Sequence, residues 1–185
     1  MKNYILLLLI LISVCTFGQT KIAGVELPNS VEIESVKADI NGAGIREKFW
    51  IDLYAGALYV TDKTSDANQV IKANQPMGIK IHIVSRLISS KKMKDAVEEG
   101  FQNSTQKNTK PLRGKIDKFI SFFKDEIVKH DIFDIFYHPD VGVKVYKNDE
   151  LKGIIKGTKF KEALFGIWFC DKPADDDLKE DMLGI

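Results

Sequence analysis

The chain has 185 residues, of which 27 are lysine or arginine and 26 are aspartate or glutamate, so its formal net charge is +1 at pH 7. Such a balance gives no electrostatic reason to expect nucleic acid or an anionic membrane as the partner. The length is sufficient for one domain with a buried hydrophobic core.

The N-terminus has the order of a secretory signal peptide. A charged Lys2 precedes an apolar run over residues 4–12, and small and polar residues then lead to Gly18 and Gln19. The apolar run is shorter than the ~20 residues needed to span a bilayer, so we expect cleavage after Gly18 rather than a membrane anchor. The sequence therefore predicts an exported protein, periplasmic or secreted, whose mature domain covers residues 19–185 without a membrane-spanning segment.

Lipidation of Cys15 is the weaker alternative, because Val14 before it is bulkier than the small residue that lipoprotein processing normally requires. After cleavage Cys170 would be the one remaining cysteine, so the mature chain could form no intramolecular disulfide. Cys170 lies in an apolar run over residues 165–170, which favours a packed thiol over a reactive one. Stability is therefore expected to come from the hydrophobic core.

Alternating patterns dominate the first part of the mature chain. Residues 31–34 alternate apolar and charged side chains, as expected for a strand with one solvated face. The glycine-rich residues 41–44 interrupt this pattern, which predicts a break in the strand. Residues 45–60 then alternate over a long run, and we expect one extended strand there.

Helical spacing follows, and then a second group of strands. Three of the predicted helices cover residues 66–74, 116–128 and 175–182. Two others begin at capping residues: one is capped by Ser89 or Ser90 and continues to about residue 101, and one is capped by Thr158 and continues to residue 169. The predicted strands cover residues 78–85, 132–137, 141–146 and 150–156. This order favours an antiparallel sheet covered by helices over an alternating parallel design, so the predicted fold class is α+β.

Residue types that usually mark a catalytic or cofactor site are scattered along the chain. His82, His130 and His138 show no metal-ligand spacing. Residues 42–44 lack the third glycine of a dinucleotide-binding loop, and no phosphate-binding Gly-Lys-Ser/Thr sequence occurs. No serine lies in a recognisable nucleophile motif. We therefore expect no metal site, no cofactor and no catalytic nucleophile.

Arg46 and Tyr54 are the most suggestive polar residues. They are eight positions apart in the predicted long strand, so both side chains would lie on the same face, together with Trp50. If that face points into the fold, the guanidinium group and the phenol hydroxyl could together hold a carboxylate or an enolate at the end of an apolar cavity. The alternative is a solvent-exposed Arg46 at a strand edge and a Tyr54 that simply packs, and spacing alone favours this alternative.

A resemblance to a known family changes this balance. Residues 42–48 followed by residues 53–60 resemble the signature of the chalcone isomerase-like family, particularly its bacterial exported and plant fatty-acid-binding branches. Similar segments occur later, at residues 84–86, 160–168 and 182–184, so the resemblance covers most of the mature chain. It implies an open-faced β-sandwich, in which a long antiparallel sheet is backed by a layer of helices and the ligand cleft lies between them.

The resemblance also assigns roles to individual residues. It implies that Arg46 meets the anionic end of a ligand and that Tyr54 assists it, whereas true isomerases have a threonine at the place of Tyr54. The catalytic tyrosine of true isomerases has no counterpart in residues 89–93, and Gly100 stands near the place of their asparagine. The resemblance therefore implies a binder rather than an isomerase.

Three hypotheses follow. The first is that the domain sequesters an apolar acid, with fatty acid as the leading choice, using Arg46, Tyr54, Trp50 and Arg86. Arg86 is the secondary candidate among these, because a solvated loop arginine explains it equally well. The second is an isomerase or lyase that acts on a small enolisable substrate through Arg46 and Tyr54. The third is an interaction domain whose cleft is filled by its own side chains.

Overall fold

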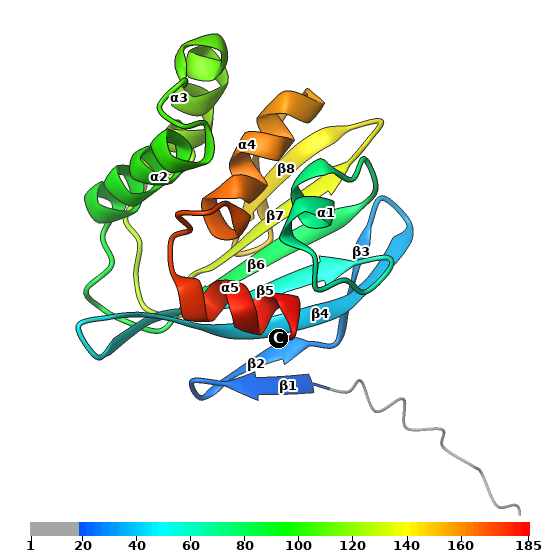
Figure 1. Cartoon of the computed structure of the whole chain (residues 1–185). Helices are drawn as coiled ribbons and strands as arrows, with labels where there is room; N and C mark the ends of the chain where they lie inside the picture. Colours follow the sequence, from blue (N-terminus) through cyan, green and yellow to red (C-terminus); the bar gives the residue numbers. More distant parts are fainter. Residues whose placement is uncertain (1–18) are drawn as a thin grey trace, which may run out of the picture.

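A seven-stranded antiparallel sheet forms the centre of the structure, which is a computed structural model describing residues 19–185 (Figure 1). The predicted signal peptide, residues 1–18, lies outside the described residues. Each strand of the sheet pairs with the next one in the sequence. In order across the sheet these are β3 (Ser30–Ile33), β4 (Val36–Lys48), β5 (Ile51–Val60), β6 (Met77–Ile83), β7 (Ile132–His138), β8 (Gly142–Lys147) and β9 (Glu150–Ile155). A separate hairpin of β1 (Gln19–Ile22) and β2 (Val25–Pro28) lies beside β4 in Figure 1.

Helices back one side of this sheet (Figure 1). They are α1 (Ala67–Lys72), α2 (Ser90–Ser104), the short 3₁₀ helix η1 (Lys110–Leu112), α3 (Arg113–Ser121), α4 (Thr158–Phe169) and α5 (Asp176–Leu183). An antiparallel sheet backed by helices confirms the predicted α+β class and the layered arrangement that the family resemblance implied. Within residues 19–185, no helix combines the length and the apolar character that crossing a bilayer would require.

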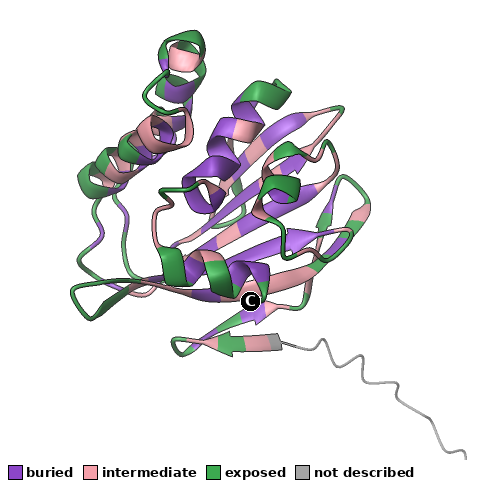
Figure 2. Ribbon diagram, viewed as in Figure 1, coloured by how far each residue is buried: buried purple, intermediate pink, exposed green. Residues whose placement is uncertain are grey.

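The main hydrophobic core lies between the sheet and the helices. Alternation along β5 directs Tyr54, Leu58 and Val60 into this core, and it directs Ala55, Ala57 and Tyr59 to the opposite side, where Leu27 and Ile33 cover them. Figure 2 shows buried residues along the central strands and along α4, the helix that lies over them. Large aromatic side chains fill this main core, among them Phe101, Phe119, Phe123, Phe133, Phe160, Phe165 and Phe169.

The prediction of one long strand over residues 45–60 was wrong. The chain forms a hairpin there, in which Lys48 of β4 pairs with Ile51 of β5 and only Phe49 and Trp50 form the turn. Their φ angles are 54° and 59°, in the left-handed region that two-residue hairpin turns use and that Asn-Gly normally supplies. A bulky residue pays roughly 1–2 kcal/mol for this conformation. The sequence therefore contains no turn signal at the position where the chain reverses.

The glycine-rich segment does not break the strand either, because β4 runs through it. A Cβ atom on Gly42 would lie 2.1 Å from the backbone oxygen of Asp181, and one on Gly44 would lie 2.2 Å from Oδ2 of the same residue. The two glycines thus allow α5 to pack closely on β4. Asn41 adds to this contact, because its side-chain amide donates a hydrogen bond to the backbone oxygen of Met182 at 2.9 Å.

Helix boundaries differ from the prediction in several places, most of all in α3. Ser89 caps α2 as expected, with its hydroxyl accepting a hydrogen bond from the backbone of Lys92 at 3.3 Å. The N-cap of α4 is Gly157 rather than Thr158, at a φ of 115°. The helix expected over residues 116–128 is displaced, because α3 already begins at residue 113 and ends at residue 121.

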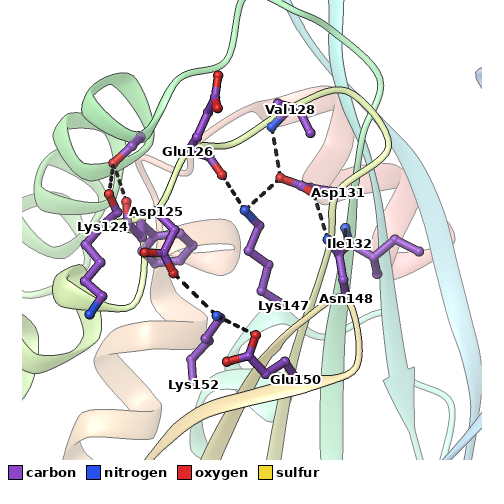
Figure 3. Close-up of polar contacts among 12 residues, drawn as sticks. Lys124, Asp125, Glu126, Val128, Asp131, Ile132, Lys147, Asn148, Glu150 and Lys152 are labelled. Carbon is purple, nitrogen blue, oxygen red and sulfur yellow. Dashed lines mark hydrogen bonds and ion pairs between the residues drawn. The ribbon is translucent and has the colours of Figure 1, made fainter.

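Polar contacts explain why the segment after α3 is not helical. Asp131 accepts hydrogen bonds from the backbone of Val128 at 2.9 Å and from the Asn148 side chain at 2.7 Å, and it pairs with Lys147 at 2.9 Å (Figure 3). Lys147 also donates to the backbone oxygen of Glu126. These contacts hold the segment between α3 and β7 against the end of β8 and the β8–β9 turn. The backbone groups of Glu126 and Val128 therefore bond to side chains instead of forming another helical turn.

Candidate functional site

Arg46 and Tyr54 lie directly opposite each other on β4 and β5. The guanidinium carbon of Arg46 is 5.8 Å from the centre of the Tyr54 ring. Cross-strand partners share a face of the sheet, and this face points toward the helices. Arg46 and Tyr54 thus share one face, as the sequence suggested, but they meet across a hairpin and not along one strand.

A second aromatic residue holds the Tyr54 hydroxyl. Trp168 of α4 donates a hydrogen bond from Nε1 to Tyr54 Oη at 3.0 Å, and the two side chains are 5% and 3% exposed. Burial raises the pKa of the Tyr54 phenol, and the neighbouring Arg46 charge opposes that shift only in part. The phenol is therefore neutral near pH 7 and keeps its own proton for donation to a ligand.

Arg46 supplies a cation without a protein counter-ion. Its side chain is half-buried, and no carboxylate of residues 19–185 lies within ion-pair distance of it. Partial burial weakens solvation of the guanidinium group, and nearby anions compensate for such a loss. An anionic ligand beside the Tyr54 hydroxyl would fill this role.

An open cavity of about 430 Å³ begins at this pair. It lies between the β4–β5 hairpin on one side and α2 with its preceding loop on the other, both at the left of Figure 1. The volume falls within the range of small-molecule sites, roughly 300–1,000 Å³. Its apolar wall is formed by Ile51, Leu53, Leu87, Ile88 and Met93, while Lys48, Lys92, Asp95 and Glu99 supply charged side chains.

Arg46 also borders two further hollows. One, of about 20 Å³, lies deeper and is lined by Tyr54, Trp168 and core side chains such as Phe119 and Phe123. The other, of about 230 Å³, is polar and includes Glu47, Glu99 and Asn103. The inner core is therefore almost filled, and the usable apolar space lies on the hairpin side of Arg46.

Trp50 and Arg86 do not join this site. Trp50 occupies the hairpin turn, is 93% exposed and does not line the cavity, because the regular strand that would have aligned it with Arg46 ends before it. Arg86 is exposed in the loop between β6 and α2, and its neighbour Leu87 lines the cavity instead. Trp168 was missed in the sequence, although a tryptophan in an apolar helix usually needs a hydrogen-bond acceptor and so signals a polar partner.

The positions that would carry the isomerase side chains border the cavity and the polar hollow, but they hold no catalytic side chain. The Ser90 hydroxyl, at the start of α2, donates a hydrogen bond to the backbone oxygen of Phe123. A Cβ atom on Gly100 would lie 2.7 Å from Ile167, so this position packs directly on α4 and leaves no room for a larger side chain. Among residues 19–185, no three potential metal-ligating side chains gather in one place. The polar groups converging on the cavity are thus Arg46, Tyr54 and the charged residues of its rim.

Comparison with known proteins agrees with this architecture. The sequence profile of chalcone isomerase-like proteins matches residues 19–184. The chain belongs to the chalcone isomerase-like family. A solved structure with the same fold is that of a fatty-acid binding protein of Arabidopsis thaliana, with a TM-score of 0.70 and 18% sequence identity over 90% of this chain and 96% of that chain. A search of curated proteins finds no match. The resemblance to the chalcone isomerase-like family depended on residues 42–48. This segment contains the two glycines on which α5 packs, and it also contains Arg46.

Proposed function

We propose that this protein is an exported, non-catalytic binder of a lipophilic carboxylic acid, with a fatty acid as the leading candidate. The observation that carries the proposal is the half-buried Arg46 guanidinium, without a protein counter-ion, beside the neutral Tyr54 phenol, since both residues line one apolar cavity. The ligand carboxylate would lie at this pair, and its alkyl chain would extend along the apolar wall.

The chemistry of the pair suits a carboxylate. Arginine offers planar N–H donors that match the two carboxylate oxygens, and charge-assisted hydrogen bonds of this kind are stronger than neutral ones. Tyr54 can add a further donor, because Trp168 already occupies one acceptor position of its oxygen. An alkyl chain needs only apolar contact, which Leu53, Ile88 and Met93 provide.

The solved structure from Arabidopsis supports this proposal, since it is that of a fatty-acid binding protein and its fold matches over nearly the whole chain. The alternative of an isomerase or lyase fits less well. A general base must be deprotonated near the working pH so that it can accept a proton from the substrate. Burial raises the pKa of Tyr54 and so keeps the phenol protonated. An interaction domain with a filled cleft also fits less well, because about 430 Å³ next to Arg46 is open.

Export is supported by the sequence pattern of residues 1–18, a charged residue followed by an apolar run and a small-residue boundary. Fatty acids have low solubility as monomers, since each buried CH₂ group is worth about 0.8 kcal/mol. A binder outside the cytoplasm would therefore hold such an acid in aqueous surroundings.

The test is mass spectrometry of lipids extracted from the purified protein and from its Arg46→Ala variant. We expect a fatty acid in the extract of the unchanged protein and a strong decrease in the variant. Arg86→Ala is the matched control, because Arg86 is an exposed arginine that does not line the cavity. Equal amounts of lipid from the unchanged protein and Arg46→Ala would show that Arg46 does not anchor the ligand.

A further inference from the structure

The tip of the β4–β5 hairpin exposes an unusual amount of apolar surface. Phe49 is 79% exposed, Trp50 93% and Ile51 41%, and Leu87 of the neighbouring loop is 49% exposed. These four are a majority of the large hydrophobic residues that are exposed in the described chain, the others being Val128, Leu151 and Ile185. Such a concentration on one surface marks an interaction site more often than chance exposure does.

The two aromatic residues at this tip have a strained backbone conformation. Phe49 and Trp50 both occupy left-handed φ angles, although Asn-Gly would form the same turn without that strain. Strained positions persist where surrounding structure or function requires them. Neither side chain contributes to the buried core, so folding gives no reason for two aromatic residues here.

Basic side chains flank the apolar tip. Lys48 precedes the turn with its ammonium 5.8 Å from the Phe49 ring centre, Arg86 adjoins Leu87, and Lys92 donates a hydrogen bond to the backbone oxygen of Leu87 at 3.0 Å. The first turn of α2 carries no acidic residue, although acidic residues are favoured at a helix N-terminus. The nearest acidic pair on the hairpin, Glu47 and Asp52, lies one position farther from the turn.

This surface is continuous with the cavity mouth. Phe49, Ile51 and Leu87 are exposed and also line the cavity, as do Lys48 and Lys92. In Figure 1 the hairpin extends to the left beyond the rest of the sheet, near the start of α2. A flat surface that meets the hairpin tip would therefore lie against the entrance of the cavity.

We propose that this tip docks the protein onto a lipid bilayer that contains anionic phospholipids, with Phe49, Trp50, Ile51 and Leu87 entering the interface and Lys48, Arg86 and Lys92 contacting the headgroups. Aromatic side chains, tryptophan above all, are favoured at the boundary between headgroups and acyl chains. Basic residues beside them add attraction to anionic lipids. The net charge of +1 is a sum over the whole chain, so it does not show the basic residues that gather beside the tip. Transfer of an apolar acid between bilayer and cavity rests on the proposed function, but docking itself does not.

Tryptophan fluorescence tests the docking directly, because the chain has two tryptophans and Trp168 is buried in the core while Trp50 is exposed. The probe is vesicles of phosphatidylcholine with phosphatidylglycerol, compared with phosphatidylcholine alone. We expect the emission of Trp50 to shift to shorter wavelength and the protein to sediment with the anionic vesicles. We expect both effects to weaken in high salt, because the Debye length decreases.

A double variant separates docking from folding. Phe49→Asn with Trp50→Gly installs the favoured turn, so we expect it to fold at least as well as the unchanged protein and to lose about tenfold or more in vesicle partitioning. Arg86→Glu should weaken partitioning without changing the apolar tip. Trp50→Gly should retain fatty-acid binding in vesicle-free solution, since Trp50 does not line the cavity.

Two results would overturn the proposal. One is the absence of sedimentation with anionic vesicles in a protein that binds palmitate in solution. The other is a fluorescence shift that appears without vesicles as the protein concentration rises, since this would assign the tip to contact between copies of the chain. Loss of palmitate binding with intact vesicle binding would instead contradict the proposed function and leave the docking supported.

Discussion

Arg46 and Tyr54 are cross-strand partners, with the guanidinium carbon 5.8 Å from the centre of the phenol ring. The Tyr54 side of this pair is fixed by Trp168, which donates to its hydroxyl from a different layer of the fold. The Arg46 side meets no carboxylate in residues 19–185 and borders open space. The pair therefore presents one charge and one neutral donor from a rigid wall, which is a suitable arrangement for orienting an anionic group.

Tyr54→Phe should destabilise the protein even without ligand. The substitution leaves the buried Trp168 N–H without its acceptor, and an unsatisfied buried donor costs about 1–3 kcal/mol. Urea denaturation would measure the change in free energy of unfolding. Tyr54→Phe combined with Trp168→Phe should cost less than the sum of the two single changes, because the lost hydrogen bond is then counted once. Strict additivity would show that the contact contributes nothing.

Gly42→Ala should destabilise the protein by about 1–3 kcal/mol, because the added methyl group overlaps the backbone oxygen of Asp181 and forces α5 away from β4. Gly114→Ala is the matched control. Gly114 lies in α3 with open space around it, so alanine should stabilise the helix by roughly 0.5–1 kcal/mol. Thermal unfolding of both variants should therefore give shifts of opposite sign. A neutral Gly42→Ala would contradict the close packing of α5.

Lys161 is a fully buried lysine whose ammonium donates hydrogen bonds to the backbone oxygens of Val70, Ile71 and Ala73 at 2.7, 3.0 and 2.7 Å. Burial lowers its pKa to about 8. Between pH 8 and 10.5 the unfolded chain binds this proton and the folded chain does not, so the contribution of Lys161 to stability rises with pH across that window.

The measurement is the free energy of unfolding of the unchanged protein and of Lys161→Met at pH 7.5 and pH 10. The variant should be less stable at both values, because three backbone oxygens lose their donor. The stability difference between the two proteins should be larger at pH 10. A difference that is constant or smaller at pH 10 would contradict the lowered pKa of Lys161.

Ala96→Phe should reduce fatty-acid affinity by about tenfold or more, because residue 96 borders the cavity, the inner hollow and the polar hollow around Arg46. A phenyl ring there would occupy space next to the guanidinium group. Lys94→Phe in the same helix is the control, since residue 94 lines none of these hollows. Isothermal titration with palmitate compares the two. Equal affinities for both variants would place the ligand elsewhere.

Sequence patterns predicted most of the sheet and helices, because apolar periodicity and capping residues act locally. The strands β7, β8 and β9 and the cap at Ser89 follow from such signals. The hairpin turn did not, since Phe49 and Trp50 are among the residues least suited to left-handed φ. The assignment of Trp50 to the site depended on a regular strand and failed with it.

Long-range contacts account for the remaining differences. By local rules the glycines at positions 42 and 44 indicate a turn. In the structure they are needed because α5, which is distant in the sequence, packs so closely on β4 that no side chain fits there. The hydrogen bond from Trp168 to Tyr54 joins residues 114 positions apart. Arg46 and Tyr54 could be named in advance because the family motif contains them, whereas Leu53, Ile88 and Met93 of the cavity wall resemble ordinary core residues in the sequence.

The role of Arg46 as carboxylate anchor is tested by comparing the affinity of palmitate with that of hexadecanol, which has an alkyl chain of the same length without the carboxylate. The unchanged protein should prefer the acid by roughly 10- to 100-fold, as expected for charge-assisted hydrogen bonds of about 1.5–3 kcal/mol. Arg46→Gln should bind both ligands with similar affinity. An unchanged preference for the acid in Arg46→Gln would contradict the assignment of Arg46 as the carboxylate anchor.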